Sequence, residues 1–288
     1  MKIILSRKGF DSSNGGFASP IMPNGRLLSL PIPVNEKQKE KRERGIIYDK
    51  LKFDGKSLSE VISQLSKCQF ANKEAHLDPD LDPDRFPPRE RDWRSVFGQT
   101  GNAQSHLTNQ SVGVGDLFLF YGWFTEDNQD CHVVFGWLQI NKILKVDQDQ
   151  DKIENWLRYH PHIVNADIGD YRRNNTIYIA RDKLELNGCR SIAGAGVFPH
   201  FKPALRLTAP CETRRSHWRL PKWFYPSFDS FGQPQRKPLS YHKKQERWEL
   251  HNNHVILKTA RRGQEFVFDT KDYPEAIDWL NDLFEDCC

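Results

Sequence analysis

The chain has 288 residues, a formal net charge of +4 and only 38% hydrophobic residues. Aromatic residues make up 12%, which excludes a chain that is disordered throughout, because such chains are poor in aromatics. The longest apolar runs, such as residues 117–124, are far shorter than the ~20 residues that a membrane helix needs. Charge follows early, at Lys2 and Arg7, so we expect no signal sequence. We therefore expect a cytoplasmic protein without membrane association, whose six cysteines, with no C-x-x-C pair among them, stay reduced.

Hydrophobic periodicity predicts the elements along the chain. In order, these are strands at 3–5 and 27–32, an exposed charged loop or helix end at 36–44, a helix at 58–68, a proline-rich extended loop at 74–91, strands within 112–146, a helix at 151–160, strands at 176–180 and 204–208, and an acidic helix at 274–284. Strands outnumber helices and follow one another directly. We therefore predict an α+β fold around a largely antiparallel, curved sheet, with a PUA-like β-barrel and peripheral helices as the alternative. We expect one domain over residues 1–288, with its strand core at about 95–210.

The positive charge is concentrated in one segment. Residues 202–262 contain 14 Lys or Arg and 4 Asp or Glu, a local charge of +10, whereas residues 263–288 contain 1 and 8, a local charge of −7. A segment with this charge attracts phosphate groups. The alternative is a solvated face that the acidic tail partly neutralises.

A glycine-rich loop follows the first predicted strand, in the sequence S-R-K-G-F-D-S-S-N-G-G at 6–16. Its backbone N–H groups could surround an anion while basic side chains supply charge. The candidate phosphate-binding residues are Ser6, Arg7, Lys8 and Ser12, and Asp11 is a candidate catalytic carboxylate. The spacing matches neither a P-loop nor a dinucleotide fingerprint, and a tight turn with surface charges is the alternative.

The segment E-A-H-L-D-P-D-L-D-P-D at 74–84 alternates polar and other residues. In an extended chain His76, Asp78 and Asp80 point to one side, which suits a divalent metal or acid–base catalysis. His106 and Asp116 are candidates for further ligands. An acidic, proline-rich surface loop is the alternative.

Residues 97–110 are rich in amide and hydroxyl groups. Side chains such as Gln104 and His106 could read the edge of a base through hydrogen bonds, although ordinary loops have a similar composition. We expect the segments 6–12, 76–80 and 104–106 to share one pocket.

Two aromatic strands, at 115–124 and 135–143, resemble the barrel strands of the PUA, ASCH and EVE superfamily. Those barrels bind RNA or extruded modified bases, and the resemblance implies that Trp123 or Trp137 stacks on a base. The alternative is that both tryptophans belong to the core.

Basic and aromatic residues alternate in R-R-S-H-W-R-L-P-K-W-F at 214–224. Such a strip suits a nucleic acid, because cations bind phosphates and aromatic rings stack on bases. The candidate residues for this contact are Arg214, Arg215, Trp218, Arg219, Lys222 and Trp223. A packed aromatic segment with solvated cations is the alternative.

Several blocks of the sequence together resemble one family, the nucleotide modification associated domain family of the third type, found in bacteria and their phages. They are M-K-I-I-L-S-R-K-G-F-D-S-S-x-G-G, A-H-L-D-P-D-L, F-G-Q-x-G-x-A-Q-x-H-L, G-D-L-F-L-F-Y-G-W-F and R-x-x-W-x-L-P-x-W-F, in this order from Met1 to residue 224. The resemblance implies a role in DNA base modification and assigns no catalytic residue.

We expect the protein to bind a nucleotide or a nucleic acid, DNA in preference to RNA, and to act on it with a divalent metal or an acid–base pair. The candidate catalytic residues are Asp11, His76, Asp78, Asp80 and His106. Two other functions stay open at this stage. One is a non-catalytic, PUA-like reader of modified nucleic acid, and the other is an interaction subunit, with partner proteins, of a modification or phage-defence system.

Overall fold

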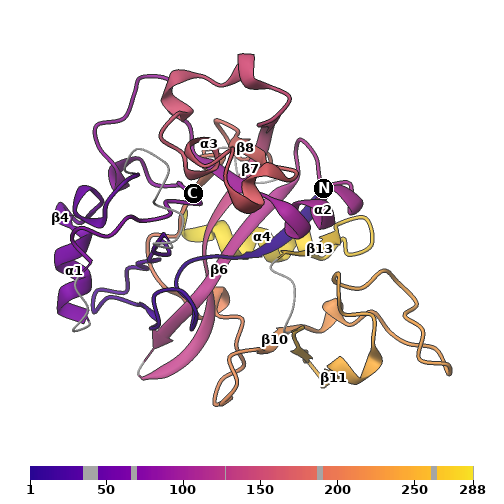
Figure 1. The fold of residues 1–288 in the computed structure, drawn as a ribbon. Coiled ribbons are helices and arrows are strands. Elements are labelled where there is room, and N and C mark those ends of the chain that lie inside the picture. The colour runs from indigo at the N-terminus through magenta and orange to yellow at the C-terminus, as the bar shows by residue number, and fades with distance from the viewer. Residues whose placement is uncertain (35–44, 66–69, 127, 187–190, 261–264, 288) are drawn as a thin grey trace.

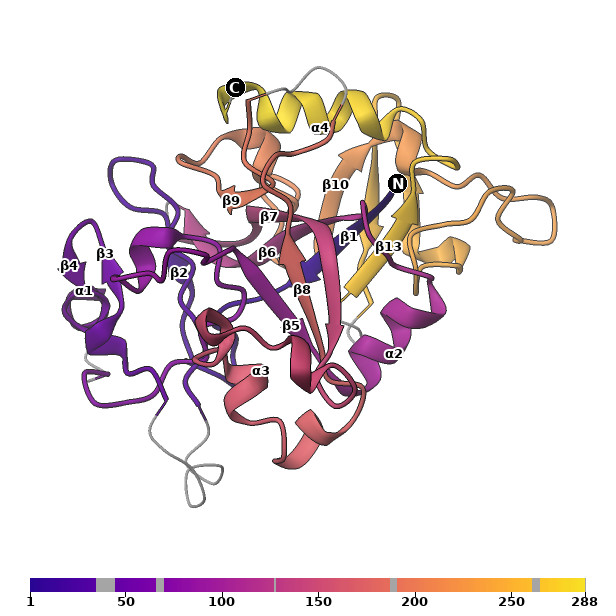
Figure 2. The same ribbon diagram turned by 90° about the horizontal axis from the view of Figure 1, so that it is seen from above.

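A sheet of eight strands forms the centre of the protein (Figures 1 and 2). The computed structural model describes residues 1–34, 45–65, 70–126, 128–186, 191–260 and 265–287. The strand order is β13–β1–β6–β7–β8–β5, with β2 added to β6 and β9 to β7. These strands are β1 (Lys2–Arg7), β2 (Ser19–Pro20), β5 (Val96–Gln99), β6 (Leu117–Glu126), β7 (Gln129–Lys145), β8 (Thr176–Ala180), β9 (Ala195–Val197) and β13 (Glu265–Asp269). The β1–β6 and β2–β6 pairs are parallel and the other pairs are antiparallel.

The β6–β7 hairpin is the core of this sheet. Residues 117–121 of β6 are all buried, on both faces of the strand. A strand with two buried faces reads as a continuous apolar run rather than as an alternating one, as it does here. In Figure 2, α4 (Ala276–Phe284) lies on one side of the sheet, and α3 (Pro161–Val164), which packs near β5, lies on the other.

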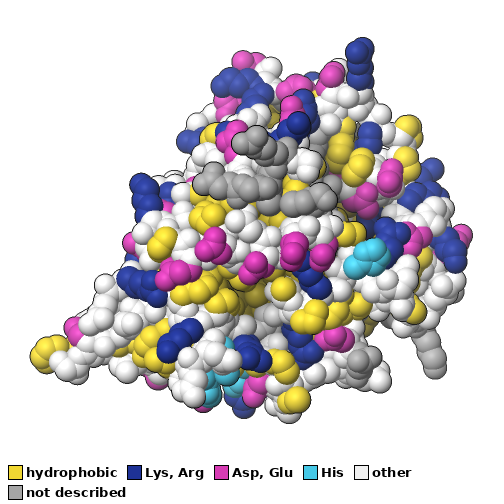
Figure 3. Space-filling view, turned by 180° about the vertical axis from the view of Figure 1, so that it is seen from behind, with side chains coloured by type: hydrophobic (Ala, Val, Ile, Leu, Met, Phe, Trp, Pro, Cys, Tyr) yellow, Lys and Arg dark blue, Asp and Glu magenta, His cyan; other side chains and the backbone are white. Residues whose placement is uncertain are grey.

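The remaining elements surround the sheet. A second sheet has the order β10–β12–β11, from β10 (His217–Pro221), β11 (Trp248–Leu250) and β12 (His254–Lys258). The short hairpin of β3 (Lys52–Phe53) and β4 (Lys56–Ser57) leads into α1 (Leu58–Leu65), and α2 (Gly101–Asn109) follows β5. On the face seen in Figure 3, acidic side chains form a row across the middle. No helix among the described residues is long and apolar enough to cross a bilayer.

The α+β fold with a mostly antiparallel sheet is confirmed, and the barrel alternative is not. Over the described residues, β13 and β5 end the sheet and do not pair with each other, so the sheet stays open. The predicted strands at 3–5, 112–146 and 176–180 and the helices at 58–68 and 274–284 correspond to β1, β6 with β7, β8, α1 and α4. The predicted segment at 36–44 and the end of the predicted helix at 66–68 lie outside the described residues.

Three predicted elements are wrong. Residues 27–32 are buried but form no strand, because the N–H of Leu30 is bonded to the Ser19 hydroxyl and Pro31 has no N–H. Residues 204–208 overlap a 3-10 turn that begins at Pro203 instead of forming a strand. Residues 151–160 form separate 3-10 turns rather than one helix.

Trp218 belongs to the core. Its side chain is 0% exposed, and its indole N–H donates to His132 Nδ1 at 3.0 Å. Trp223 packs among Phe224, Tyr273 and Trp279, so it too serves the core. Trp218 and Trp223 therefore stabilise the core of the protein. Their packing does not favour base stacking by either ring.

We predict that Trp218→Ala lowers the free energy of unfolding by ~3–5 kcal/mol, because it removes a fully buried indole and leaves a cavity. Urea denaturation followed by circular dichroism measures this loss. The exposed Lys222, in the same strip, provides the control, since Lys222→Ala should stay within ~0.5 kcal/mol of the wild type. Equal stability of the two variants would contradict the placement of Trp218 in the core.

Candidate functional site

The Asp78 side chain is buried at the free edge of β5. The segment before β5 runs beside this strand, where Asp80 and Val96 exchange two backbone hydrogen bonds of 2.9 Å. β5 is the last strand of the sheet order, so its outward N–H groups have no strand to bond. The Gly98 N–H uses Asp78 instead and donates to Oδ1 at 2.8 Å.

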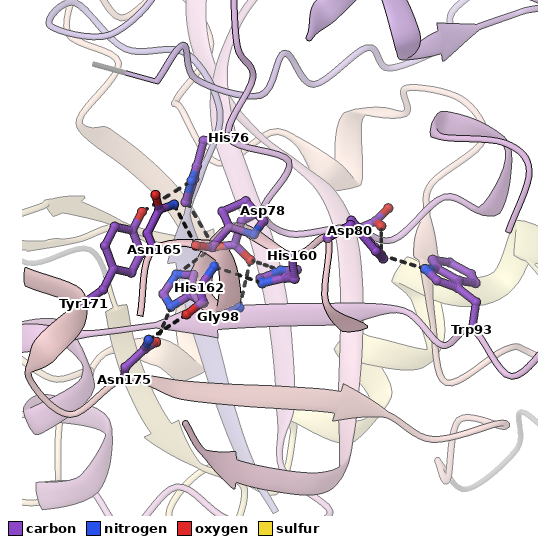
Figure 4. A network of polar contacts seen from close by, with 12 residues as sticks. His76, Asp78, Asp80, Trp93, Gly98, His160, His162, Asn165, Tyr171 and Asn175 are labelled. Atoms are coloured by element: carbon purple, nitrogen blue, oxygen red, sulfur yellow. Dashed lines mark hydrogen bonds and ion pairs between the residues drawn. The ribbon is translucent and has the colours of Figure 1, made fainter. Parts of the chain in front are cut away.

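Three histidines surround this carboxylate (Figure 4). His76 Nε2 lies 3.7 Å and His162 Nε2 lies 3.6 Å from Asp78 Oδ2, while His160 Nε2 lies 3.4 Å from Oδ1. One nitrogen of His76, one nitrogen of His162 and one oxygen of Asp78 lie within 4.8 Å of one another. Two imidazoles and one carboxylate are a common ligand set for divalent transition metals.

Hydrogen bonds fix the tautomer of His162. The Asn175 amide donates through Nδ2 to the His162 carbonyl at 2.7 Å, so its Oδ1 must be the acceptor 2.7 Å from His162 Nδ1. Nδ1 therefore carries the proton, and Nε2 presents a lone pair toward the Asp78 carboxylate. A second partner that orients an imidazole in this way is typical of metal-binding histidines.

His160 has the opposite tautomer and a different position. It is the N-cap of α3, and its Nδ1 accepts from the His162 N–H at 3.3 Å. Its proton is therefore on Nε2, which faces Asp78 Oδ1. Within the described part of the chain His160 Nε2 makes no hydrogen bond, and it faces Oδ1 while Oδ2 faces His76 and His162.

The pKa values of the cluster follow from burial and from these contacts. Burial alone would raise the pKa of Asp78, but the contacts with His160, His162 and His76 hold it well below its usual range. Burial lowers the pKa of His162, against the opposing effect of Asp78. These contacts thus shift Asp78 toward its ionised form, and burial shifts His162 toward its neutral form.

The close approach of His162 to β5 requires a glycine. A Cβ atom on Gly98 would overlap the Cδ2 and Cγ atoms of the His162 ring. Gly98 also supplies the N–H that holds Asp78, so one position of β5 serves two members of the cluster.

The cluster opens into a basic cavity of about 190 Å³. Its lining includes His76, Asp78, His162, Arg7, Lys8, Asp11, Gln99, Trp123, His132, Tyr171 and Arg215. The three cations differ in how they are held. Lys8 Nζ lies 3.2 Å from Glu265 Oε1, and the Arg215 guanidinium lies 4.2 Å from the centre of the Trp123 ring. The side chain of Arg7, at the end of β1, makes no ion pair or hydrogen bond with any described residue.

The glycine-rich loop lies at this cavity, but most of its N–H groups already have partners. Asp11 Oδ1 accepts from the N–H groups of Ser13 and Asn14, and the Asp11 carbonyl accepts from Gly16. Ser12 is exposed and does not line the cavity, and the Ser6 hydroxyl is buried. Arg7, Lys8 and Asp11 are thus the sequence-predicted residues of this loop that reach the cavity.

The structure brings two of the three predicted segments together and leaves the third apart. His106 Nε2 lies 3.0 Å from the Ser240 hydroxyl, and Gln104 accepts from the Tyr178 hydroxyl at 2.8 Å. Neither residue lines the cavity, because α2 carries both away from it. Asp116 accepts from the backbone N–H groups of Lys2 and Gly113 instead of joining the cluster.

Asp80 does not join the metal-ligand cluster either. It is fully buried and makes two hydrogen bonds with Arg89, of 2.6 and 2.8 Å, and one with the Tyr159 hydroxyl at 2.5 Å. Figure 4 shows it on the side of Trp93, away from His76. Its carboxylate neutralises a nearly buried arginine, and His162 takes the place that the alternating pattern gives to Asp80.

The basic residues at 214–224 point to different places. Arg215 reaches the cavity of the cluster, whereas Arg214 and Arg219 each line another cavity and Lys222 is exposed. Of these four cations only Arg219 lies on β10, whereas Arg214 and Arg215 precede this strand and Lys222 follows it. The strip is therefore not one continuous phosphate-binding surface.

Sequence reasoning missed His160, His162, Asn175 and the cavity-lining His132. One signal was present: His160-Pro161-His162 repeats the spacing of His76 and Asp78, with one residue between two potential ligands. We assigned only His160 of that segment to the predicted helix at 151–160, and its proximity to Asp78 is a contact across more than 80 residues that spacing does not show.

The fold and the site together define a class of protein. It is an α+β protein with a two-histidine, one-carboxylate cluster at the edge of a mainly antiparallel sheet, open to a basic cavity. The chain belongs to the family described as nucleotide modification associated domain 3, whose family model matches residues 2–269, and so has a role associated with nucleotide modification. Comparisons with curated proteins and with solved structures give no match.

We predict that Gly98→Ala destabilises the protein by ~1–3 kcal/mol, because the added methyl group forces the His162 ring out of position. The histidine ring signals in an NMR spectrum should report the movement of His162. Gly113→Ala is the matched control, since a Cβ atom there meets nothing within 4 Å. An unchanged His162 signal in Gly98→Ala would contradict the packing described for this ring.

Proposed function

We propose that the protein is a divalent-metal-dependent enzyme that acts on a nucleotide bound in the basic cavity. One observation carries the proposal: His162 Nε2 and His76 Nε2 lie 3.6 and 3.7 Å from Asp78 Oδ2, and one ligand atom from each of the three residues lies within 4.8 Å of the others. Both distances are too long for a direct hydrogen bond, whereas a cation among these atoms would contact all three residues. The residues present therefore fit a divalent metal ion.

His76, Asp78 and His162 would hold the ion. Asn175 and His160 orient the ligands, since each fixes one of them through a hydrogen bond or a close polar contact. When bound, such an ion can polarise a substrate oxygen or activate a water molecule. Tyr171, whose hydroxyl lies 3.4 Å from His76 Nδ1, also lines the cavity and is placed to contact a substrate.

The cavity also supports a phosphate-bearing substrate. Arg7, Lys8 and Arg215 bring three cations to its lining, of which Lys8 is paired with Glu265 and Arg215 with Asp130, and a bound ion would add two further positive charges. Arg7 is the cation best placed to form new hydrogen bonds, because its guanidinium is not bonded to the described part of the protein. Arginine suits phosphate, since its planar group can donate two parallel hydrogen bonds.

The reader alternative loses its main support. It relied on a PUA-like barrel and on stacking tryptophans, whereas the sheet is open and Trp218 is in the core. Trp123 does line the cavity, but the Arg215 guanidinium already lies over its ring. A metal-ligand cluster favours an enzyme over a reader, because recognising a base needs no metal.

We predict that the purified protein binds about one equivalent of Mn²⁺ or Zn²⁺ in equilibrium dialysis with metal analysis. Asp78→Asn and His162→Ala should abolish this binding, because each removes a ligand atom. Asp78→Asn is nearly isosteric and keeps an oxygen for the Gly98 N–H, so it also tests the charge alone. His200→Ala, at an exposed histidine outside the cavity, should bind metal as the wild type does. Wild-type binding by Asp78→Asn and His162→Ala would contradict the site.

We predict that Arg7→Ala weakens binding of a nucleoside monophosphate by ~10–100-fold in isothermal titration calorimetry, because a hydrogen-bonded charge contributes about 1.5–3 kcal/mol. The uncharged nucleoside should bind the wild type and the variant equally. Arg91→Ala, at an exposed arginine outside the cavity, is the matched control. If Arg7→Ala keeps the wild-type affinity for the monophosphate, Arg7 does not bind the phosphate.

A further inference from the structure

A second, larger cavity lies beside β10 and β12 and is also basic. Its volume is about 570 Å³, and its lining includes Arg214, His217, Tyr241, Arg247 and Lys258. No Asp or Glu is among the residues described as lining it. The comparison with the family assigns it no role.

The cations of this cavity are available to a ligand. Within the described part of the chain, the side chains of Arg214 and Lys258 make no ion pair and no hydrogen bond, and both residues are exposed. Arg247 donates to the Lys258 carbonyl at 3.0 Å, which fixes its position without neutralising its charge. Only His217 is paired with an acid, Glu212. Three positive charges held close together favour a ligand with several negative charges.

An exposed aromatic ring accompanies these cations. Tyr241 is 45% exposed, and the ring of His106 lies 4.3 Å from its centre at an angle of 31°. The His106 ring thus packs against one face of the Tyr241 ring. Cations beside an exposed aromatic ring are typical of proteins that bind single-stranded nucleic acids, where unpaired bases stack on the ring.

The two basic cavities lie next to each other, because two consecutive residues line them. Arg214 lines the larger cavity, and Arg215 lines the cavity of the metal-ligand cluster. Consecutive Cα atoms are only about 3.8 Å apart, so the two cavities adjoin the same short stretch of backbone.

We infer that the substrate is a nucleotide within single-stranded DNA, with the reacting nucleotide in the cavity of the metal-ligand cluster and its neighbours along Arg214, Lys258 and Tyr241. This inference rests on the proposed function and specifies its substrate class. The basic cavity beside β10 binds the backbone, and the ring of Tyr241 stacks on one base.

Fluorescence anisotropy of the full chain with a labelled eight-nucleotide DNA strand tests the inference. The logarithm of the binding constant should fall with the logarithm of salt concentration with a slope of about −2, at roughly −0.7 for each of three phosphates. Arg214→Ala and Lys258→Ala should each make the slope shallower by about 0.7. Lys222→Ala, at an exposed cation of the same segment outside this cavity, should leave it unchanged.

Tyr241→Ala should weaken strand binding by about 5- to 150-fold without changing the salt slope, because stacking is independent of salt. Tyr241→Phe keeps the ring and should bind as the wild type does. Thermal unfolding of all variants should match the wild type, since every changed side chain is at least partly exposed.

Three outcomes would overturn the inference, and they differ from failure of the proposed function. Duplex DNA binding as tightly as the single strand would exclude single-strand recognition. Wild-type slopes in Arg214→Ala and Lys258→Ala would place the strand elsewhere. Binding of a mononucleotide without binding of the strand would make the substrate a free nucleotide and leave the proposed function standing, whereas binding of neither would remove both.

Discussion

A buried carboxylate needs hydrogen-bond donors or positive charge around it. Asp78 is such a carboxylate, and it lies at the edge of the sheet. The Gly98 N–H donates to Oδ1, and His160 Nε2 faces the same oxygen at 3.4 Å. Among the described residues Oδ2 faces His76 and His162, and because His162 Nδ1–H donates to Asn175, a neutral His162 ring has no proton on the nitrogen that faces the carboxylate. The proposed cation would lie among these atoms.

The sheet makes this arrangement possible because β5 is its last strand. An edge strand has one row of unpaired N–H and C=O groups, which proteins usually cover. Here the segment of Asp78 and Asp80 covers it, and the Asp80–Val96 bridge fixes the position of Asp78 along β5. Asp80 therefore supports the site, although not as the predicted metal ligand or catalytic residue. Its pairing with Arg89 and Tyr159 anchors the segment that carries Asp78.

The long, strongly apolar elements could be predicted from the sequence, and the irregular ones could not. Residues 117–145 form a hairpin of two long strands, as their apolar runs indicate, because a fully buried strand depends mainly on local composition. Residues 27–32 have a similar composition but are buried by packing against α1 and its neighbours, with their N–H groups bonded outside any ladder. Local pattern does not distinguish these two kinds of burial.

The site was predictable where its residues are close in sequence. His76 and Asp78 lie on one extended segment, and their spacing indicated a shared role. His162 and Asn175 are distant in sequence, and the fold brings them next to these residues. The tautomer of His162 depends on its hydrogen bond with Asn175. The grouping of Arg7 with Arg215 likewise depends on β1 and β10 approaching the same cavity.

The most direct test of the account is an anomalous difference map from a crystal of the protein soaked in Mn²⁺. The account predicts one strong peak within bonding distance, roughly 2.0–2.3 Å, of His76 Nε2, His162 Nε2 and Asp78 Oδ2. A well-ordered Asp78 cluster without a peak, while Mn²⁺ binds elsewhere on the molecule, would contradict it.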